Sequence, residues 1–136
     1  MVLIDDELLL IENSKKYLTA FLLDSRTFYP FAMIMDNEGI VYPLEHTVEE
    51  EYPNPNSLID LYERTFRNEI KEMGSEYKLG ILCIDVLIHS TIDGISSKRN
   101  AIEIRFVGKT YQKKVVLFYE MTKENQVLFQ ELVGWD

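Results

Sequence analysis

The feature that most constrains the fold is an apolar run from Leu79 to Ser90, LGILCIDVLIHS, which carries a single acid, Asp85, near its centre. Side chains alternate between two faces along a β-strand, so Asp85 would share its face with Cys83 and His89. The opposite face would hold only leucine, isoleucine and valine, and it is predicted to be core. A charge in mid-strand indicates that its own face is solvated, ion-paired or functional.

Length and composition predict one folded domain over residues 1–136. A chain of 136 residues has the size of a single domain and buries about two-thirds of its unfolded surface. Its residues are 46% hydrophobic and 12% aromatic. This composition supplies a core and is not typical of a disordered chain.

A first helix is predicted from about Asp5 to Ser25. The apolar residues Leu8, Ile11 and Leu18 lie at helical spacing along this segment. Asp5 or Asp6 can cap the helix, because a short acidic side chain accepts hydrogen bonds from the free amides of the first turn.

A β-hairpin is predicted to follow this helix. The apolar segments 31–36 and 40–44 flank Asn37-Glu38-Gly39, and Gly39 is free to adopt the positive φ angle of a tight turn. Pro43 has no amide hydrogen to donate to a neighbouring strand. The second strand of the hairpin is therefore expected at an edge of the sheet.

A second helix is predicted after an acidic loop, residues 45–56, which is rich in proline and asparagine toward its end. Ser57 and Asp60 resemble a capping pair, and Gly74 suits the C-terminal end of the helix. Steps of three and four residues place one apolar face on this helix: Ile59, Tyr62, Phe66, Ile70 and Met73.

Three strands are expected next, over residues 79–89, 100–107 and 113–121. The tail, residues 122–136, contains Leu128 and Leu132 in an i,i+4 relation and is predicted to form a short helix. We expect the tail to dock on its own domain, because an apolar stripe exposed to water is unusual. The alternative is contact with a partner or with a second copy.

These elements predict an α+β fold with two layers. The order α-β-β-α-β-β-β and the short connections favour a largely antiparallel, five-stranded sheet. Two main helices would cover one face of that sheet, followed by the short C-terminal helix or tail.

The charge of the chain argues against a nucleic-acid partner. The chain carries 23 acids and 14 bases, a formal net charge of -9, and its basic residues cluster only in short pairs such as Lys98-Arg99 and Lys113-Lys114. Binding of nucleic acid needs a concentrated basic patch, so no nucleic-acid partner is expected. An acidic surface favours a basic partner or serves solubility.

Cellular location is predicted from the cysteine content and the apolar segments. Cys83 is the only cysteine, which excludes an internal disulfide and suits a reducing compartment. The N-terminal segment lacks the basic region of a signal peptide, and no apolar run approaches the ~20 residues that span a bilayer. We expect a cytoplasmic protein without a membrane partner.

Sequence motifs for catalysis, cofactors and metals are missing. The chain has no phosphate-binding glycine loop, dinucleotide fingerprint, nucleophile elbow or CxxC pair, so no cofactor and no catalytic residue is predicted. His46 and His89 show no metal-ligand spacing, and no metal site is expected. Cys83 is read as a packing residue, because the nearby anion of Asp85 would raise its pKa.

Two groups of residues are the candidates for binding. The acids Glu49, Glu50 and Glu51 with Tyr52 form an acidic loop that could dock a basic protein, and otherwise it is a solvated loop. Asp85 could reach Arg105 across neighbouring strands. That pair forms either a functional polar patch or an ion-pair ladder on a solvated face. Other tyrosines at strand ends or in loops suit contacts: Tyr29, Tyr42 and Tyr111.

The hairpin FAMIMDNEGIVYPL, with its D-x-x-G turn from Asp36 to Gly39, and the element order resemble roadblock/longin-like and profilin-like domains. That resemblance implies action through dimer or partner contacts rather than catalysis. In size, acidity and lack of motifs the chain also resembles small bacterial proteins that include immunity proteins, which neutralise toxins. Neither resemblance assigns a functional residue to this chain.

The sequence therefore predicts a non-enzymatic protein-binding domain that recognises a basic partner through an acidic surface, with an immunity-like role as one form. A second hypothesis is a domain for a small ligand or for catalysis, with a pocket between sheet and helix and with Asp85 and Arg105 as its polar groups. A third is a structural homodimer.

Overall fold

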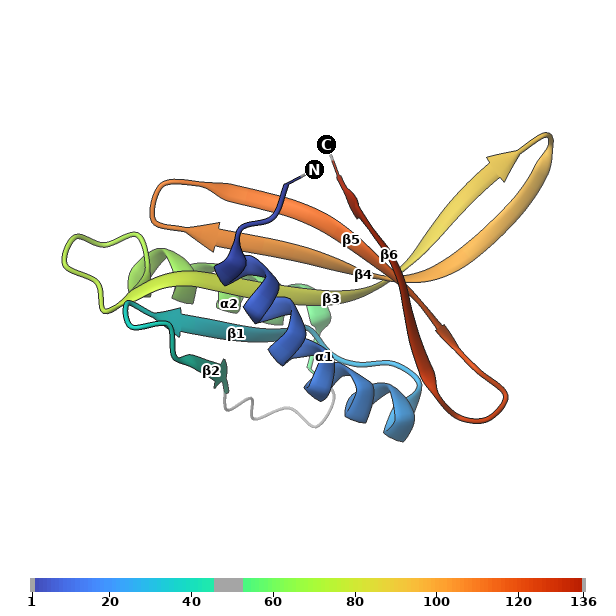
Figure 1. Ribbon diagram of the computed structural model, residues 1–136, viewed down its shortest axis with the longest axis horizontal. Coiled ribbons are helices and arrows are strands. Elements are labelled where there is room, and N and C mark those ends of the chain that lie inside the picture. The colour runs from blue at the N-terminus through green and yellow to red at the C-terminus, as the bar shows by residue number, and fades with distance from the viewer. Residues whose placement is uncertain (1, 46–52, 136) are drawn as a thin grey trace.

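The computed structural model describes residues 2–45 and 53–135, and these form two helices and one antiparallel sheet of six strands (Figure 1). The sheet order is β2-β1-β3-β4-β5-β6. The elements are α1 (Asp5–Ser25), β1 (Phe31–Asp36), β2 (Val41–Leu44), α2 (Pro55–Glu69), β3 (Tyr77–Ile92), β4 (Ile95–Gly108), β5 (Gln112–Met121) and β6 (Val127–Gly134). The α+β class, the antiparallel sheet and the position of β2 at an edge are confirmed.

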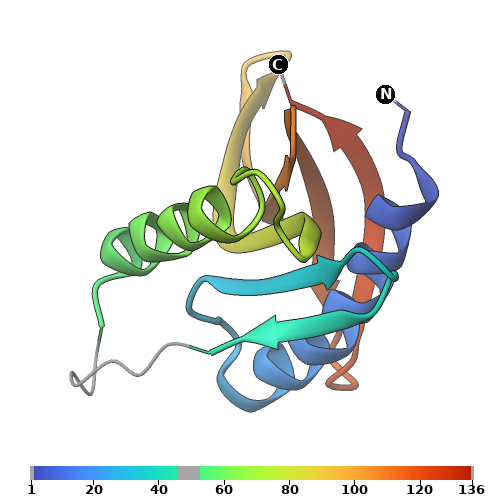
Figure 2. The same cartoon turned by 90° about the vertical axis from the view of Figure 1, so that its left-hand side faces the viewer.

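The two helices lie on opposite faces of the sheet, so the prediction of two layers with both helices on one face was wrong (Figure 2). Met33 and Met35 of β1 pack with α1, whereas Ala32 and Ile34 pack with Phe66 of α2. Strand β1 is apolar at five consecutive positions, and such a strand must be covered on both sides.

The sheet curls around α1. The core on the α1 side takes buried residues from β1, β3, β4 and β5, and Val41 of the edge strand β2 packs against it. At the far edge, Phe129 and Leu132 of β6 reach the same core. The core on the α2 side draws instead on β1, β3 and one residue of β4, Val107. The outer face of β5 and β6 therefore carries no helix within the described part of the chain.

The tail is a sixth strand rather than the predicted short helix. A turn closed by the Thr122 amide on the Gln126 carbonyl, with Asn125 at a positive φ, returns the chain against β5. An irregularity in the pairing leaves Leu128 exposed while Leu132 packs on the core. The expected docking of the tail on its own domain is confirmed, but through a β-ladder.

The N-terminal capping residues of both helices differ from the predicted ones, although α1 spans Asp5–Ser25 as predicted. Ile4, not Asp5 or Asp6, is the N-cap residue of α1, and these acids lie in its first turn. Helix α2 is capped by Asn54, whose side chain accepts a 2.8 Å hydrogen bond from the Asn56 amide, and not by the Ser57–Asp60 pair. It ends at Glu69, with Ile70 as its C-cap residue, before Gly74. No helix within the described residues is long and apolar enough to cross a membrane.

Strands β3 and β4 are longer than predicted and extend past the sheet as a two-stranded ribbon (Figure 1). The ribbon ends in a turn at Asp93 and Gly94, both at positive φ, between the paired residues Ile92 and Ile95. These angles are those of the tight turn that suits the twist of a hairpin.

Candidate functional site

The candidate site is a cavity of about 630 Å³ at the C-terminal end of α1, where the chain turns into β1. This volume falls within the range of small-ligand sites. The lining residues come from the end of α1, the connection to β1 and the first residue of α2: Phe21, Asp24, Ser25, Thr27, Phe28, Tyr29, Pro30, Phe31 and Pro55. We call this cavity the aromatic pocket.

Four aromatic rings line the pocket, and one anchors the others to the sheet. Phe31 begins β1 and meets Phe21 edge-on, with ring centroids 5.4 Å apart. Tyr17, one helical turn before Phe21, lies 5.2 Å from the same ring. Phe28 packs against the α1-side core, while 46% of Tyr29 is exposed. The pocket thus combines aromatic rings that contact one another or the core with the exposed ring of Tyr29.

The charged side chain in the lining is acidic, and it lies at the unfavourable end of a helix. The last turn of α1 contains no basic residue, and Asp24 lies there, exposed, with a hydrogen bond from Ser25 Oγ at 3.1 Å. A helix C-terminus carries partial negative charge, so an acid there costs stability. Arg26 follows at a positive φ but is not among the lining residues. Among the described lining residues, the charged side chain is therefore an acid at a helix C-terminus.

Asp85 is not among the lining residues, but it contacts one of them, Thr27. Its carboxylate accepts hydrogen bonds from Thr27 Oγ1 at 2.7 Å and from the Tyr119 hydroxyl at 2.8 Å. Burial and the neighbouring Asp85 raise the pKa of Tyr119, so this tyrosine stays protonated and donates. Asp85 thus ties the α1–β1 connection to β3 and β5 and positions Thr27.

Asp85 and Arg105 lie on opposite faces of the sheet, so the prediction that they meet was wrong. The strands do pair, but in a register that sets Asp85 opposite Ile102 and Arg105 opposite Leu82. Residues opposite each other in a sheet share a face. Asp85 therefore points to the α1 side and Arg105 to the α2 side.

Arg105 instead belongs to an ion-pair cluster under α2. Its guanidinium lies 2.6 Å from Glu63 of α2 and 2.6 Å from Glu103, which is 7% exposed. A smaller cavity of about 230 Å³ lies beside this cluster. Since both carboxylates already neutralise the guanidinium, the cluster serves to hold α2 on the sheet.

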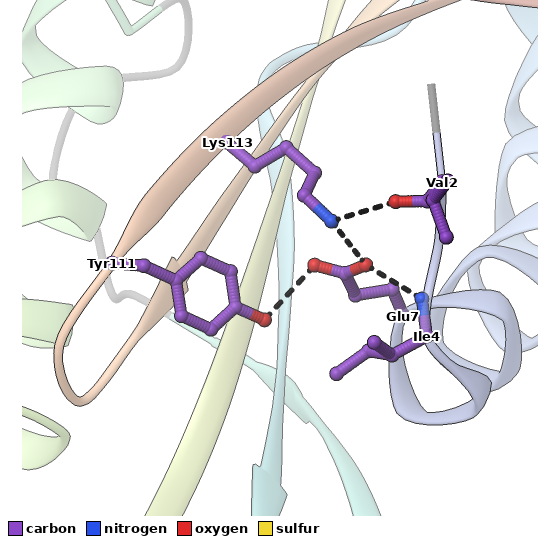
Figure 3. Close-up of polar contacts among 5 residues, drawn as sticks. All are labelled: Val2, Ile4, Glu7, Tyr111 and Lys113. Carbon is purple, nitrogen blue, oxygen red and sulfur yellow. Dashed lines mark hydrogen bonds and ion pairs between the residues drawn. The ribbon is translucent and has the colours of Figure 1, made fainter.

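A second buried cluster anchors the start of α1 (Figure 3). Glu7 is fully buried and accepts from the Ile4 amide, the Tyr111 hydroxyl and Lys113 Nζ, at 2.9, 2.9 and 2.7 Å. Lys113 also donates to the Val2 carbonyl. These hydrogen bonds give partners to the Glu7 carboxylate, the Tyr111 hydroxyl and the Lys113 ammonium, and they tie α1 to the β4–β5 hairpin. Tyr111, an interface candidate in the sequence, therefore has a structural role.

The remaining sequence candidates lie elsewhere or outside the described residues. Cys83 is fully buried, and burial raises the pKa of its thiol to about 12, so it is an inert packing residue. In the described part of the chain no three histidine, cysteine or acidic side chains gather as metal ligands. Glu49, Glu50, Glu51 and Tyr52, with His46, lie outside the described residues.

Sequence reasoning named Tyr29 but missed the pocket around it. The missed signal is the segment TFYPF, residues 27–31, which sets Phe28 and Tyr29 in the short connection after α1 and Phe31 at the start of β1. Loops carry binding residues more often than the elements they join. Comparisons with protein-family models, with curated proteins and with solved structures each found no match to this chain.

Proposed function

We propose that this chain is a protein-binding domain that takes a cationic side chain of a basic partner into the aromatic pocket. The observation that carries the proposal is the lining: its described residues combine aromatic rings with Asp24 at the C-terminal end of α1 and include no lysine or arginine. An ammonium or guanidinium group is attracted both to aromatic faces and to a helix C-terminus.

The charge of the whole chain supports the same class of partner. A net charge of -9 attracts basic proteins over a distance and raises the rate of encounter. The pocket would then fix the position of the bound partner by receiving one lysine or arginine side chain. An immunity-like role, in which the partner is a basic toxin, is one form of this function.

Asp24 offers a test that separates binding from folding. Asp24→Asn removes the acid from the unfavourable end of the helix, so it should raise the free energy of unfolding by about 0.5 kcal/mol while it weakens cation binding. Glu12→Gln is the matched control, because Glu12 is an exposed acid of the same helix paired with Lys15. The control should leave binding unchanged.

The ligands are capped pentapeptides that differ only at a central lysine, arginine, trimethyllysine or norleucine, titrated into ¹⁵N-labelled protein. We expect the three cationic peptides to shift the amides of residues 24–29 and 31 and to bind about fivefold more tightly than the norleucine peptide, a difference of about 1 kcal/mol. Equal binding of norleucine, or equal loss in the two variants, would refute the cationic ligand. No shift with any peptide would refute the pocket itself.

A further inference from the structure

The ribbon that β3 and β4 form beyond the sheet has two open edges. Strand β1 pairs with β3 only up to Cys83, and β5 pairs with β4 only from Ala101 onward. Within the described residues, the ribbon from residue 87 to residue 100 therefore has no neighbouring strand on either edge. A two-stranded ribbon alone is marginally stable in water, and an open edge is a template for another strand.

Charges protect one of these edges but not the other. The β4 edge carries Lys98 and Arg99, the kind of residue that prevents edge-to-edge pairing. The β3 edge, Leu87–Ile92, carries no acid, lysine or arginine and is rich in β-branched residues. Two of its three apolar side chains are exposed, Leu87 by 48% and Ile92 by 69%, and the third, Ile88, is half-buried.

The outward amides of β3 can be assigned from the turn. In a two-residue hairpin the residues that flank the turn, Ile92 and Ile95, exchange backbone hydrogen bonds, and the bonding alternates along the ladder. Ser90 and Ile88 therefore bond to β4. The amides of Leu87, His89 and Thr91 point away from β4, toward the open edge.

The ribbon is also where two copies of this acidic chain can approach. Arg99 is neutralised by Glu131 of β6, 2.5 Å away, and it stacks on Phe118 at 3.9 Å. Asp93 offsets Lys98 within the same ribbon. The ribbon is thus nearly neutral and projects from a body that holds the excess negative charge (Figure 1). Two copies joined through their ribbons would keep their acidic bodies apart, which limits the electrostatic repulsion between them.

We infer that two copies of this chain associate through their ribbons, with the Leu87–Ile92 edge of one β3 pairing antiparallel to the same edge of the other about a two-fold axis. An identical edge that pairs with itself satisfies both rows of outward amides and carbonyls and closes the assembly at two copies. The contact is small compared with a stable dimer interface, so the dimer is concentration-dependent.

A pair of proline variants tests this inference. His89→Pro removes one outward amide from the β3 edge, and Lys98→Pro makes the same change at its cross-strand partner on the β4 edge. Neither proline removes a bond between β3 and β4. With light scattering after gel filtration, the native chain and Lys98→Pro should rise from 16.0 kDa toward twice that mass as concentration increases. His89→Pro should dimerise at least about tenfold more weakly.

Two further measurements keep the test decisive if proline disturbs the ribbon. Thr91→Lys should weaken the dimer, whereas Ser96→Lys, at the paired position on β4, should not. Hydrogen exchange of Leu87, His89 and Thr91 should slow with concentration, while that of Ser90 stays unchanged. A mass of 16.0 kDa at every concentration, or equal effects on both edges, would overturn the inference.

Discussion

Lys113 Nζ lies 2.7 Å from Glu7 Oε1, across 106 positions of sequence, and the carboxylate it contacts is fully buried at the start of α1. A buried carboxylate is stable only with partners, and here it has three donors, from Ile4, Tyr111 and Lys113. The contact fixes the N-terminal end of α1 on the β4–β5 hairpin. The aromatic pocket lies at the other end of the same helix.

Removal of the Glu7 carboxylate is expected to destabilise the whole domain. Glu7→Ala leaves the Lys113 ammonium, the Tyr111 hydroxyl and the Ile4 amide without their acceptor, which should cost about 3 kcal/mol. The measurement is urea unfolding followed by circular dichroism. Glu12→Ala, at an exposed acid of the same helix, should cost less than about 1 kcal/mol. Equal losses in both variants would show that the cluster does not anchor the helix.

Stability is expected to fall at alkaline pH through the hydroxyl of Tyr119. In the unfolded chain this group loses its proton near pH 10, whereas burial and Asp85 raise its pKa in the folded chain. The stabilisation is therefore complete below pH 10 and is lost as the pH rises above it. Tyr119→Phe should show a smaller loss between about pH 8 and about pH 10.5 than the native chain does. Parallel curves for the two chains would contradict this origin.

Gly80 is expected to tolerate no side chain while Phe66 covers it. A Cβ atom at Gly80 would lie 2.5 Å from Phe66 Cε1, so Gly80→Ala must displace the ring that attaches α2 to the sheet. We expect a loss of about 2 kcal/mol in the free energy of unfolding. A double variant with Phe66→Leu should lose less than the sum of the single variants. Strict additivity in denaturant unfolding would refute the steric contact.

Arg105 is expected to stabilise the fold and to be dispensable for binding. Arg105→Met leaves Glu103 buried without a cation, which should cost about 3 kcal/mol, and adding Glu103→Leu should restore much of that loss. The peptide titration of the aromatic pocket should give the same affinity for the double variant as for the native chain. A loss of peptide affinity in the double variant, without a matching loss of stability, would show that Arg105 contributes to binding.

Local patterns in the sequence were sufficient to predict α1, the β1–β2 hairpin, α2 and the next three strands. Helical spacing, the Asp36–Gly39 turn and the position of Pro43 act within a few residues, so each is readable without the rest of the chain. The tail was predicted incorrectly because Leu128 and Leu132 suit a helix or an irregular strand equally. Only the partner strand β5 decides between the two.

The sequence by itself determined the class of the fold, the acidic character and the lack of known catalytic motifs, because these depend on composition and short-range pattern. The tertiary structure alone decided that α1 and α2 cover opposite faces, and that Asp85 meets Thr27 and Tyr119 rather than Arg105. The physical reason is register. A shift of one residue between two strands moves a side chain to the other face, and contacts far apart in sequence set that register.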